Sequence, residues 1–132
     1  MKQKLFMLSV LATVILSACG SSVTGDDVIA SFKKAGLEAE NSYAMTKDDY
    51  GPAPYVCTGT RFLIPSIGAD NGGRIFICDN AEDLALLKNY YDELGKSSAL
   101  FFSWTFTKGD VLVQINGDLP EEKARQYEAA IP

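Results

Sequence analysis

Residues 100–116 constrain the fold of this chain more than any other segment, because apolar and polar side chains alternate along two consecutive stretches. Such alternation is typical of strands with one buried face, and a tight turn between two such strands makes a hairpin. Lys108-Gly109 stands between the two stretches and suits such a turn. The alternating apolar residues are Leu100, Phe102, Trp104, Phe106, Val111, Val113 and Ile115. We therefore expect an antiparallel hairpin that buries these residues on one face.

The position of the turn decides which residues of this hairpin face one another. With Lys108 and Gly109 as the turn, Phe106 pairs with Val111. On the same face, Trp104 then pairs with Val113, and Phe102 pairs with Ile115. Each such pair contributes roughly 0.2–1 kcal/mol, so this register is favoured over a slip of one residue. Phe101 is the one aromatic residue that the alternation leaves outside the core. The opposite face then carries the polar residues Ser103, Thr105, Thr107, Gln114 and Asn116.

The remainder of residues 26–132 predicts three helices and further strands. Apolar residues recur at helical spacing in residues 26–35 and 80–94, and a third helix is expected from about Asp118. Gly36 and Gly95 are expected to end the first two helices. Residues 59–64 and 74–78 predict two strands with a turn at 68–73 between them, and residues 38–44 predict a weaker strand. We expect an α+β domain: a mainly antiparallel sheet of four or five strands, with about three helices packed on one face.

The N-terminus has the pattern of an export signal followed by a lipid attachment site. Two lysines precede an uncharged run of 14 residues, which is shorter than the roughly 20 residues of a membrane-spanning helix. The sequence Leu16-Ser17-Ala18-Cys19 then resembles the lipobox of bacterial lipoproteins. This resemblance implies cleavage before Cys19, diacylglycerol on its thiol, and attachment to the cell membrane or outer membrane. In a two-membrane envelope, Gly20 after the cysteine suggests the outer membrane. The alternatives are an ordinary secreted protein and an uncleaved anchor.

The lipobox divides the chain into a signal peptide of residues 1–18, a lipidated tether of residues 19–25 and a single domain of residues 26–132. Removing 18 of the 132 residues leaves 114, which suffices for one domain and is too small for a two-lobed solute receptor. Ten basic and seventeen acidic residues remain, giving a net charge of −7. Nucleic acid is therefore not an expected partner, because phosphate binding depends on Lys and Arg.

Two cysteines remain beside the lipidated one. Cys57 and Cys78 lie near the outer ends of neighbouring predicted strands. Disulfides persist outside the cytoplasm, so these two residues form a possible disulfide in an exported domain. The alternative is a pair of free thiols.

The chain contains no histidine. This excludes Ser-His-Asp and Cys-His catalysis, and histidine-ligated zinc, for the chain acting alone. Paired acids are present, but three such pairs fall in predicted first turns of helices, where the helix dipole accounts for them. We therefore expect no enzyme activity, no metal and no cofactor.

The loop of residues 46–55 is the candidate binding segment. It combines acids, tyrosines and prolines, a mixture that can bind a cation or a peptide. The alternative is a surface loop that prolines stiffen and tyrosines hold in place. The binding candidates are Asp48, Asp49, Tyr50 and Tyr55.

These features favour a membrane-anchored, non-catalytic binding module of the cell envelope, with an envelope protein or a cell-wall component as the partner. An inhibitory, immunity-type or structural lipoprotein is the second hypothesis, and a small carboxylate-dependent hydrolase is the third. Residues 116–123 resemble small uncharacterised lipoproteins of Gram-positive-type envelopes. That segment provides the start of a helix and implies no activity.

Overall fold

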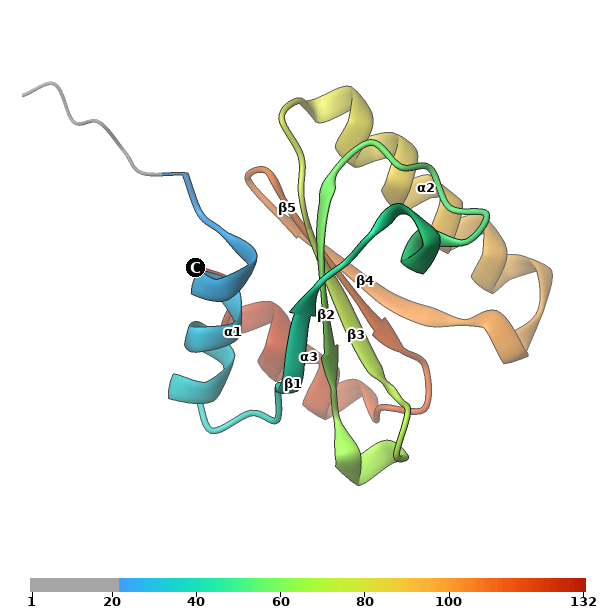
Figure 1. Ribbon diagram of the computed structural model, residues 1–132. Coiled ribbons are helices and arrows are strands. Elements are labelled where there is room, and N and C mark those ends of the chain that lie inside the picture. Colours follow the sequence, from blue (N-terminus) through green and yellow to red (C-terminus); the bar gives the residue numbers. More distant parts are fainter. Residues whose placement is uncertain (1–21) are drawn as a thin grey trace, which may run out of the picture.

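The computed structural model describes residues 22–132, which form five strands and three α-helices (Figure 1). The strands are β1 (Glu40–Ala44), β2 (Thr58–Leu63), β3 (Gly72–Ile77), β4 (Ser103–Lys108) and β5 (Val111–Asn116). The α-helices are α1 (Gly25–Lys34), α2 (Ala81–Ser97) and α3 (Glu121–Ala129). Short 3-10 helices are η1 (Lys47–Tyr50), η2 (Pro65–Ile67) and η3 (Ala99–Phe101). None of the helices within residues 22–132 has the length and apolar character needed to cross a membrane.

The strands form one antiparallel sheet in the order β1-β2-β3-β5-β4. Both predicted hairpins are present, β2–β3 and β4–β5, and they meet where β3 pairs with β5. The predicted α+β class, with an antiparallel sheet and three helices, is confirmed.

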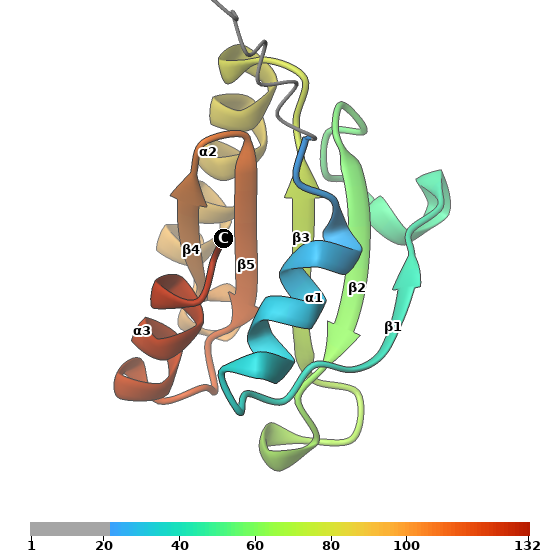
Figure 2. The same ribbon diagram turned by 90° about the vertical axis from the view of Figure 1, so that its left-hand side faces the viewer.

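The expectation that all helices pack on one face of the sheet is wrong. Figure 1 views the sheet edge-on, with α1 and α3 on one side and α2 on the other, and Figure 2 shows α1 and α3 in front of the sheet. The physical reason is that the central strands bury side chains on both faces. Ile75 and Val113 are buried toward α1 and α3, whereas Phe76 and Leu112 are buried on the α2 side. Both faces therefore need a cover.

The face under α1 and α3 holds the larger apolar core. Phe32 of α1 contacts Phe62 of β2 and Tyr127 of α3, with ring centroids 5.6 and 5.0 Å apart. The Phe62 ring lies over Gly73, where an added Cβ would come within 2.6 Å of it. This close approach explains a glycine in the middle of β3.

The caps of α1 follow from its sequence. Thr24 and Asp27 form a capping box at its start, and Gly36 has a positive φ of 76° just after its end. The backbone N–H groups of Gly36 and Leu37 donate to the carbonyls of Lys33 and Phe32, which closes the helix as expected.

The β4–β5 hairpin is present, but its turn lies one residue later than expected. Gly109 and Asp110 form the turn, so Phe106 pairs with Val113 and Lys108 pairs with Val111. Gly109 has a positive φ of 58°, which the first position of a type II′ turn requires and which lysine would adopt at a cost. The pairing moves by two residues, so each side chain keeps its expected face.

Leu100 and Phe102 do not join the core, which corrects a further expectation: Leu100 belongs to η3 and is 90% exposed, and Phe102 is 42% exposed. Phe101, which was expected outside the core, is 55% exposed. Helix α2 also continues past Gly95, where it was expected to end. An added Cβ at Gly95 would lie 3.3 Å from the Cα of Phe102, so this glycine allows η3 and its flanks to pack against the helix.

Candidate functional site

A row of polar side chains crosses all five strands on the α2 face of the sheet. Each member lies directly opposite the next across a strand pair, so the row follows from the register. Two of its five members are arginines on adjacent strands. The row consists of Tyr43, Arg61, Arg74, Gln114 and Thr105.

Arg61 and Arg74 form a like-charged pair in the middle of this row. Like charges directly opposite one another in a sheet are destabilising. Burial, and then the charge of Arg74, lower the pKa of Arg61. Within residues 22–132, neither guanidinium has a carboxylate oxygen within 4.0 Å. The sheet therefore holds two partly buried positive charges side by side, and Asp49 and Asp70 act on them only from beyond ion-pair distance.

Neutral oxygens orient the two guanidinium groups. Arg74 Nη1 donates to Gln114 Oε1 at 3.0 Å. Arg61 Nη2 donates to the backbone carbonyl of Asp70 at 2.9 Å, and its Nη1 donates to that of Gly73 at 3.3 Å. A guanidinium carries five N–H donors, so both retain several that these contacts do not use.

The arginines lie in the floor of a groove with a volume of about 610 Å³. Residues of helix α2 and η3 line it and are called its wall, and residues of η1, of the loop after it and of the β2–β3 turn also line it and are called its rim. The α2 and η3 wall is largely apolar and aromatic: Tyr90, Tyr91, Leu94, Leu100, Phe101 and Phe102. The groove thus combines a basic floor with an aromatic wall.

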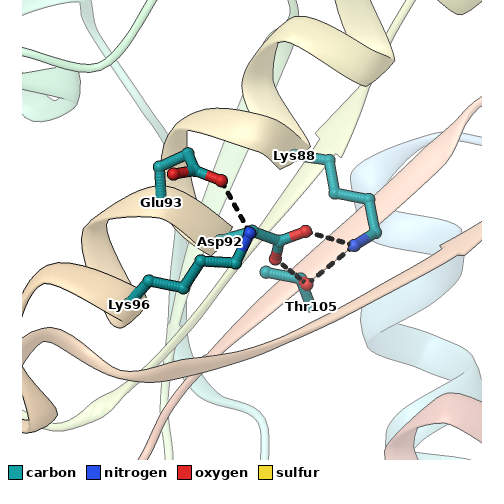
Figure 3. A network of polar contacts seen from close by, with 5 residues as sticks. All are labelled: Lys88, Asp92, Glu93, Lys96 and Thr105. Atoms are coloured by element: carbon teal, nitrogen blue, oxygen red, sulfur yellow. Dashed lines mark hydrogen bonds and ion pairs between the residues drawn. The ribbon is translucent and has the colours of Figure 1, made fainter.

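A polar network fixes the α2 wall against the sheet (Figure 3). Lys88 Nζ contacts Asp92 Oδ2 at 2.6 Å, and Thr105 Oγ1 on β4 donates to Asp92 Oδ1 at 2.6 Å. Burial raises the pKa of Asp92, but hydrogen bonds from Lys88 and Thr105 outweigh it, so the pKa is lowered. Figure 3 also shows the Lys96–Glu93 pair, which lies on the exposed side of the same helix.

The acidic residues of the rim come from η1 and from the β2–β3 turn. Asp48 and Asp49 both line the groove, as does Asp70 at the β2–β3 turn. Asp49 accepts hydrogen bonds from the Thr46 backbone N–H at 2.6 Å and from its hydroxyl at 3.0 Å. These bonds lower the pKa of Asp49, and the charge of Arg74 lowers it further. Asp49 therefore holds η1 in shape, and Asp48 is exposed.

The two candidate tyrosines of the loop have different positions. Tyr50 is buried, donates a hydrogen bond to the Cys57 carbonyl and packs against Phe76 with centroids 5.6 Å apart. Burial, with Tyr55 and Tyr91 nearby, raises the pKa of Tyr50 to about 12. Tyr55 packs edge-on against Tyr50, is 56% exposed and lies outside the groove lining. Three of the four binding candidates thus line the groove, and Tyr50 also anchors its rim.

A disulfide joins Cys57 and Cys78, as the sequence suggested. The two Cα atoms are 4.6 Å apart, just beyond the Thr58–Ile77 pair that ends the β2–β3 ladder. The bridge ties the end of the 51–56 loop to the strand that precedes α2.

Cys19 lies outside the described residues, so its lipidation stays a prediction. Between residues 22 and 132, no group of three or more Asp, Glu or Cys side chains is placed to hold a metal ion.

Comparisons with protein-family models, with curated proteins and with solved structures found no match to this chain.

The arginine pair escaped the sequence-based prediction, although a signal for it was present. Two antiparallel strands in which Cys57 lies opposite Cys78 also bring Arg61 opposite Arg74, four residues inward from each cysteine. A charged residue in the middle of each of two buried strands needs a reason. The expected disulfide and the two expected strands together contained the register that places them side by side.

Proposed function

We propose that this chain is a membrane-anchored, non-catalytic binding module of the bacterial cell envelope, and that the groove beside α2 holds its partner. The arginine pair in the groove floor carries the proposal. Two adjacent positive charges oppose folding, and a bound partner with complementary charge offsets that cost.

The floor, wall and rim of the groove are each held by fixed contacts, which supports its role as a preformed binding site. Its floor is the sheet itself, and the Lys88–Asp92–Thr105 network holds its wall. The Cys57–Cys78 bridge and the Tyr50 hydrogen bond hold its rim. A preorganised site binds more tightly because little ordering remains to be done on association.

The chemistry of the rim argues against the hydrolase alternative at Asp49. A general acid in a carboxylate-based hydrolase needs a raised pKa so that it remains protonated near neutral pH. The pKa of Asp49 is instead lowered by Thr46, which keeps the carboxylate charged.

Site-specific photo-cross-linking in the producing cell tests the binding role. A photoreactive amino acid replaces Tyr90 in the groove wall, and a matched variant carries it at Gln126, an exposed position on α3. We expect a discrete cross-linked product from position 90 that is absent at position 126 and is lost when Arg74→Gln is added. Equal products from both positions, or none from position 90, would refute the groove as the binding site.

Metabolic labelling with a fatty acid tests the anchor. The parent chain should incorporate label and fractionate with membranes, because two or more acyl chains anchor a protein stably. Cys19→Ser should lose both properties, and Cys57→Ser with Cys78→Ser should keep the label. Label that persists in Cys19→Ser would show that this part of the proposal is wrong.

A further inference from the structure

Resting on the proposed function, we infer that the groove binds a short peptide segment with a free carboxylate, an ammonium group and an apolar side chain. Arg61 and Arg74 take the carboxylate, the acidic rim takes the ammonium group, and the wall of α2 and η3 takes the apolar side chain. Each part rests on a separate feature of the groove.

The carboxylate position follows from the free donors of the arginine pair. Guanidinium groups bind carboxylates through two parallel N–H donors, and such charge-assisted hydrogen bonds are stronger than neutral ones. Arg61 and Arg74 lie on paired positions of adjacent strands, and within residues 22–132 no carboxylate pairs with either. A ligand carboxylate between them offsets the mutual repulsion of the two guanidinium groups, which adds to burial in lowering the pKa of Arg61.

The acidic rim distinguishes a carboxylate from a more highly charged anion. Asp48, Asp49 and Asp70 line the same groove, so its titratable side chains include three acids beside two arginines. The described domain also carries ten basic and seventeen acidic residues. This field repels a phosphate dianion or a polyanion more than a monoanion. It attracts an ammonium group placed toward Asp48, which is exposed at the rim.

The aromatic wall supplies the apolar part of the ligand site. Leu100, Phe101 and Phe102 are 90%, 55% and 42% exposed, although all three are large and apolar. Together with Tyr90 and Leu94 they border the arginine floor. Contiguous exposed apolar side chains beside polar groups are typical of a binding surface. A phenylalanine or leucine side chain of a peptide fits this chemistry.

Arginine side-chain NMR tests this assignment, because the chain has only three arginines. The full chain, solubilised in detergent and labelled with ¹⁵N-arginine, gives Nε–Hε signals from Arg61, Arg74 and Arg125. Arg125 lies on α3 in ion pairs with Glu121 and Glu128 and serves as the internal reference. The probes are the tripeptide Ala-Phe-Ala, its C-terminal amide, its N-acetylated form and inorganic phosphate.

We expect the free tripeptide to shift the Arg61 and Arg74 signals at millimolar concentration while Arg125 stays unchanged. The amide should weaken binding about tenfold or more, and N-acetylation should weaken it by less. Equal shifts with the amide would overturn the carboxylate assignment. Tighter binding of phosphate would replace the peptide with a phosphorylated ligand, and no shift with any probe would also overturn the inference.

Two substitutions separate a binding role from a folding role. Arg74→Gln removes one charge of the pair, and Arg61→Lys keeps the charge but loses the planar guanidinium. Both should weaken binding of the free tripeptide about tenfold or more while leaving the backbone amide spectrum folded. Arg125→Gln is the matched control and should bind as the parent does. Unchanged affinity in both groove variants would refute the assignment.

The two experiments fail independently. A cross-linked product from the groove without any arginine signal shift on adding the tripeptide would support the binding module and reject the peptide as its ligand class. Absence of the groove cross-link rejects the proposed function itself, whatever the arginine signals do.

Discussion

The two faces of the sheet are covered in different ways. On one face, α1 and α3 close a continuous apolar core in which Phe32, Phe62 and Tyr127 contact one another. On the other face, α2 together with Tyr50 of η1 and the loop after it covers an apolar half around Phe76 and Leu112, and Arg61 and Arg74 stay partly exposed. The first face stabilises the fold by burial, whereas the second keeps polar groups accessible in the groove.

The face under α2, called the open face, depends more on specific bonds than the face under α1 and α3, called the closed face. Its cover is held by the Cys57–Cys78 bridge and by the Asp92 network, in addition to packing of Leu87 and Tyr91. The comparison teaches that apolar burial and an accessible polar surface lie on opposite sides of one sheet. Substitutions on the two faces should therefore change the free energy of unfolding by different amounts and through different interactions.

The largest expected effect is on the closed face. Phe62→Ala should lower the free energy of unfolding by about 3–5 kcal/mol, because it leaves a cavity among fully buried rings. Phe101→Ala, on the exposed wall of the groove, should change it by only about 0.5 kcal/mol. Urea denaturation of both variants measures the difference. Similar losses in the two variants would contradict the division between the faces.

Removal of the disulfide should come next. The cysteines are 21 residues apart, and closing a loop of that length stabilises a fold by about 3 kcal/mol. Cys57→Ser with Cys78→Ser should lose roughly this amount in urea, and amide exchange should rise first in η1 and the loop that follows it. The parent chain under reducing conditions is the control. Earlier exchange in α1 or α3 would contradict a role confined to the open face.

A smaller, pH-dependent effect should follow from Asp92. Its pKa in the folded chain lies below the ordinary 3.8, so its contribution to stability is full above that value and is lost as pH falls through the folded pKa. Asp92→Asn should lower the free energy of unfolding at pH 7 by about 1 kcal/mol, and the deficit should shrink in acid.

Glu93→Gln is the matched control for Asp92→Asn. Its pair with Lys96 lies one residue further along α2, with both side chains about 70% exposed. Exposed pairs of this kind contribute little to stability. A deficit in Asp92→Asn that stays constant from pH 7 to acid would count against the proposed titration of Asp92.

The smallest effect should have the opposite sign. Arg74→Met removes one of two facing positive charges and keeps an apolar stem. We expect the salt-dependent part of the free energy of unfolding to rise by up to about 0.5 kcal/mol at low ionic strength and this gain to vanish in high salt, because loss of the bond to Gln114 acts equally at both. Arg125→Met breaks two exposed ion pairs and should give a small loss instead. A loss above about 1 kcal/mol in Arg74→Met would mark Arg74 as a structural residue.

Much of the fold could be predicted because side-chain periodicity reports faces directly. The β4–β5 hairpin, the Thr24 cap of α1 and the Asn80 cap at the start of α2 follow from local residue types, and the disulfide follows from the two strands expected beside it. The register of the hairpin was missed because moving the pairing by two residues keeps every side chain on the same face. Alternation alone therefore cannot decide between a Lys108-Gly109 and a Gly109-Asp110 turn.

The site was predicted less well because it depends on contacts between distant segments. Asp48 and Asp49 were selected from loop composition, and both line the groove. Leu100 and Phe102 were assigned to the core, but η3 interrupts the alternation and leaves them on the wall. Arg61 and Arg74 became neighbours only through strand pairing, which composition does not reveal.

The Cys57–Cys78 bridge has a further consequence for the order in which the groove is built. Both arginines lie between the two cysteines, so the basic part of the floor belongs to one short hairpin. The α2 and η3 wall follows later in the chain. Nearby segments meet at a lower entropic cost than distant ones. A chain that emerges N-terminus first can therefore assemble and cross-link its arginine hairpin before the helix beside it has emerged.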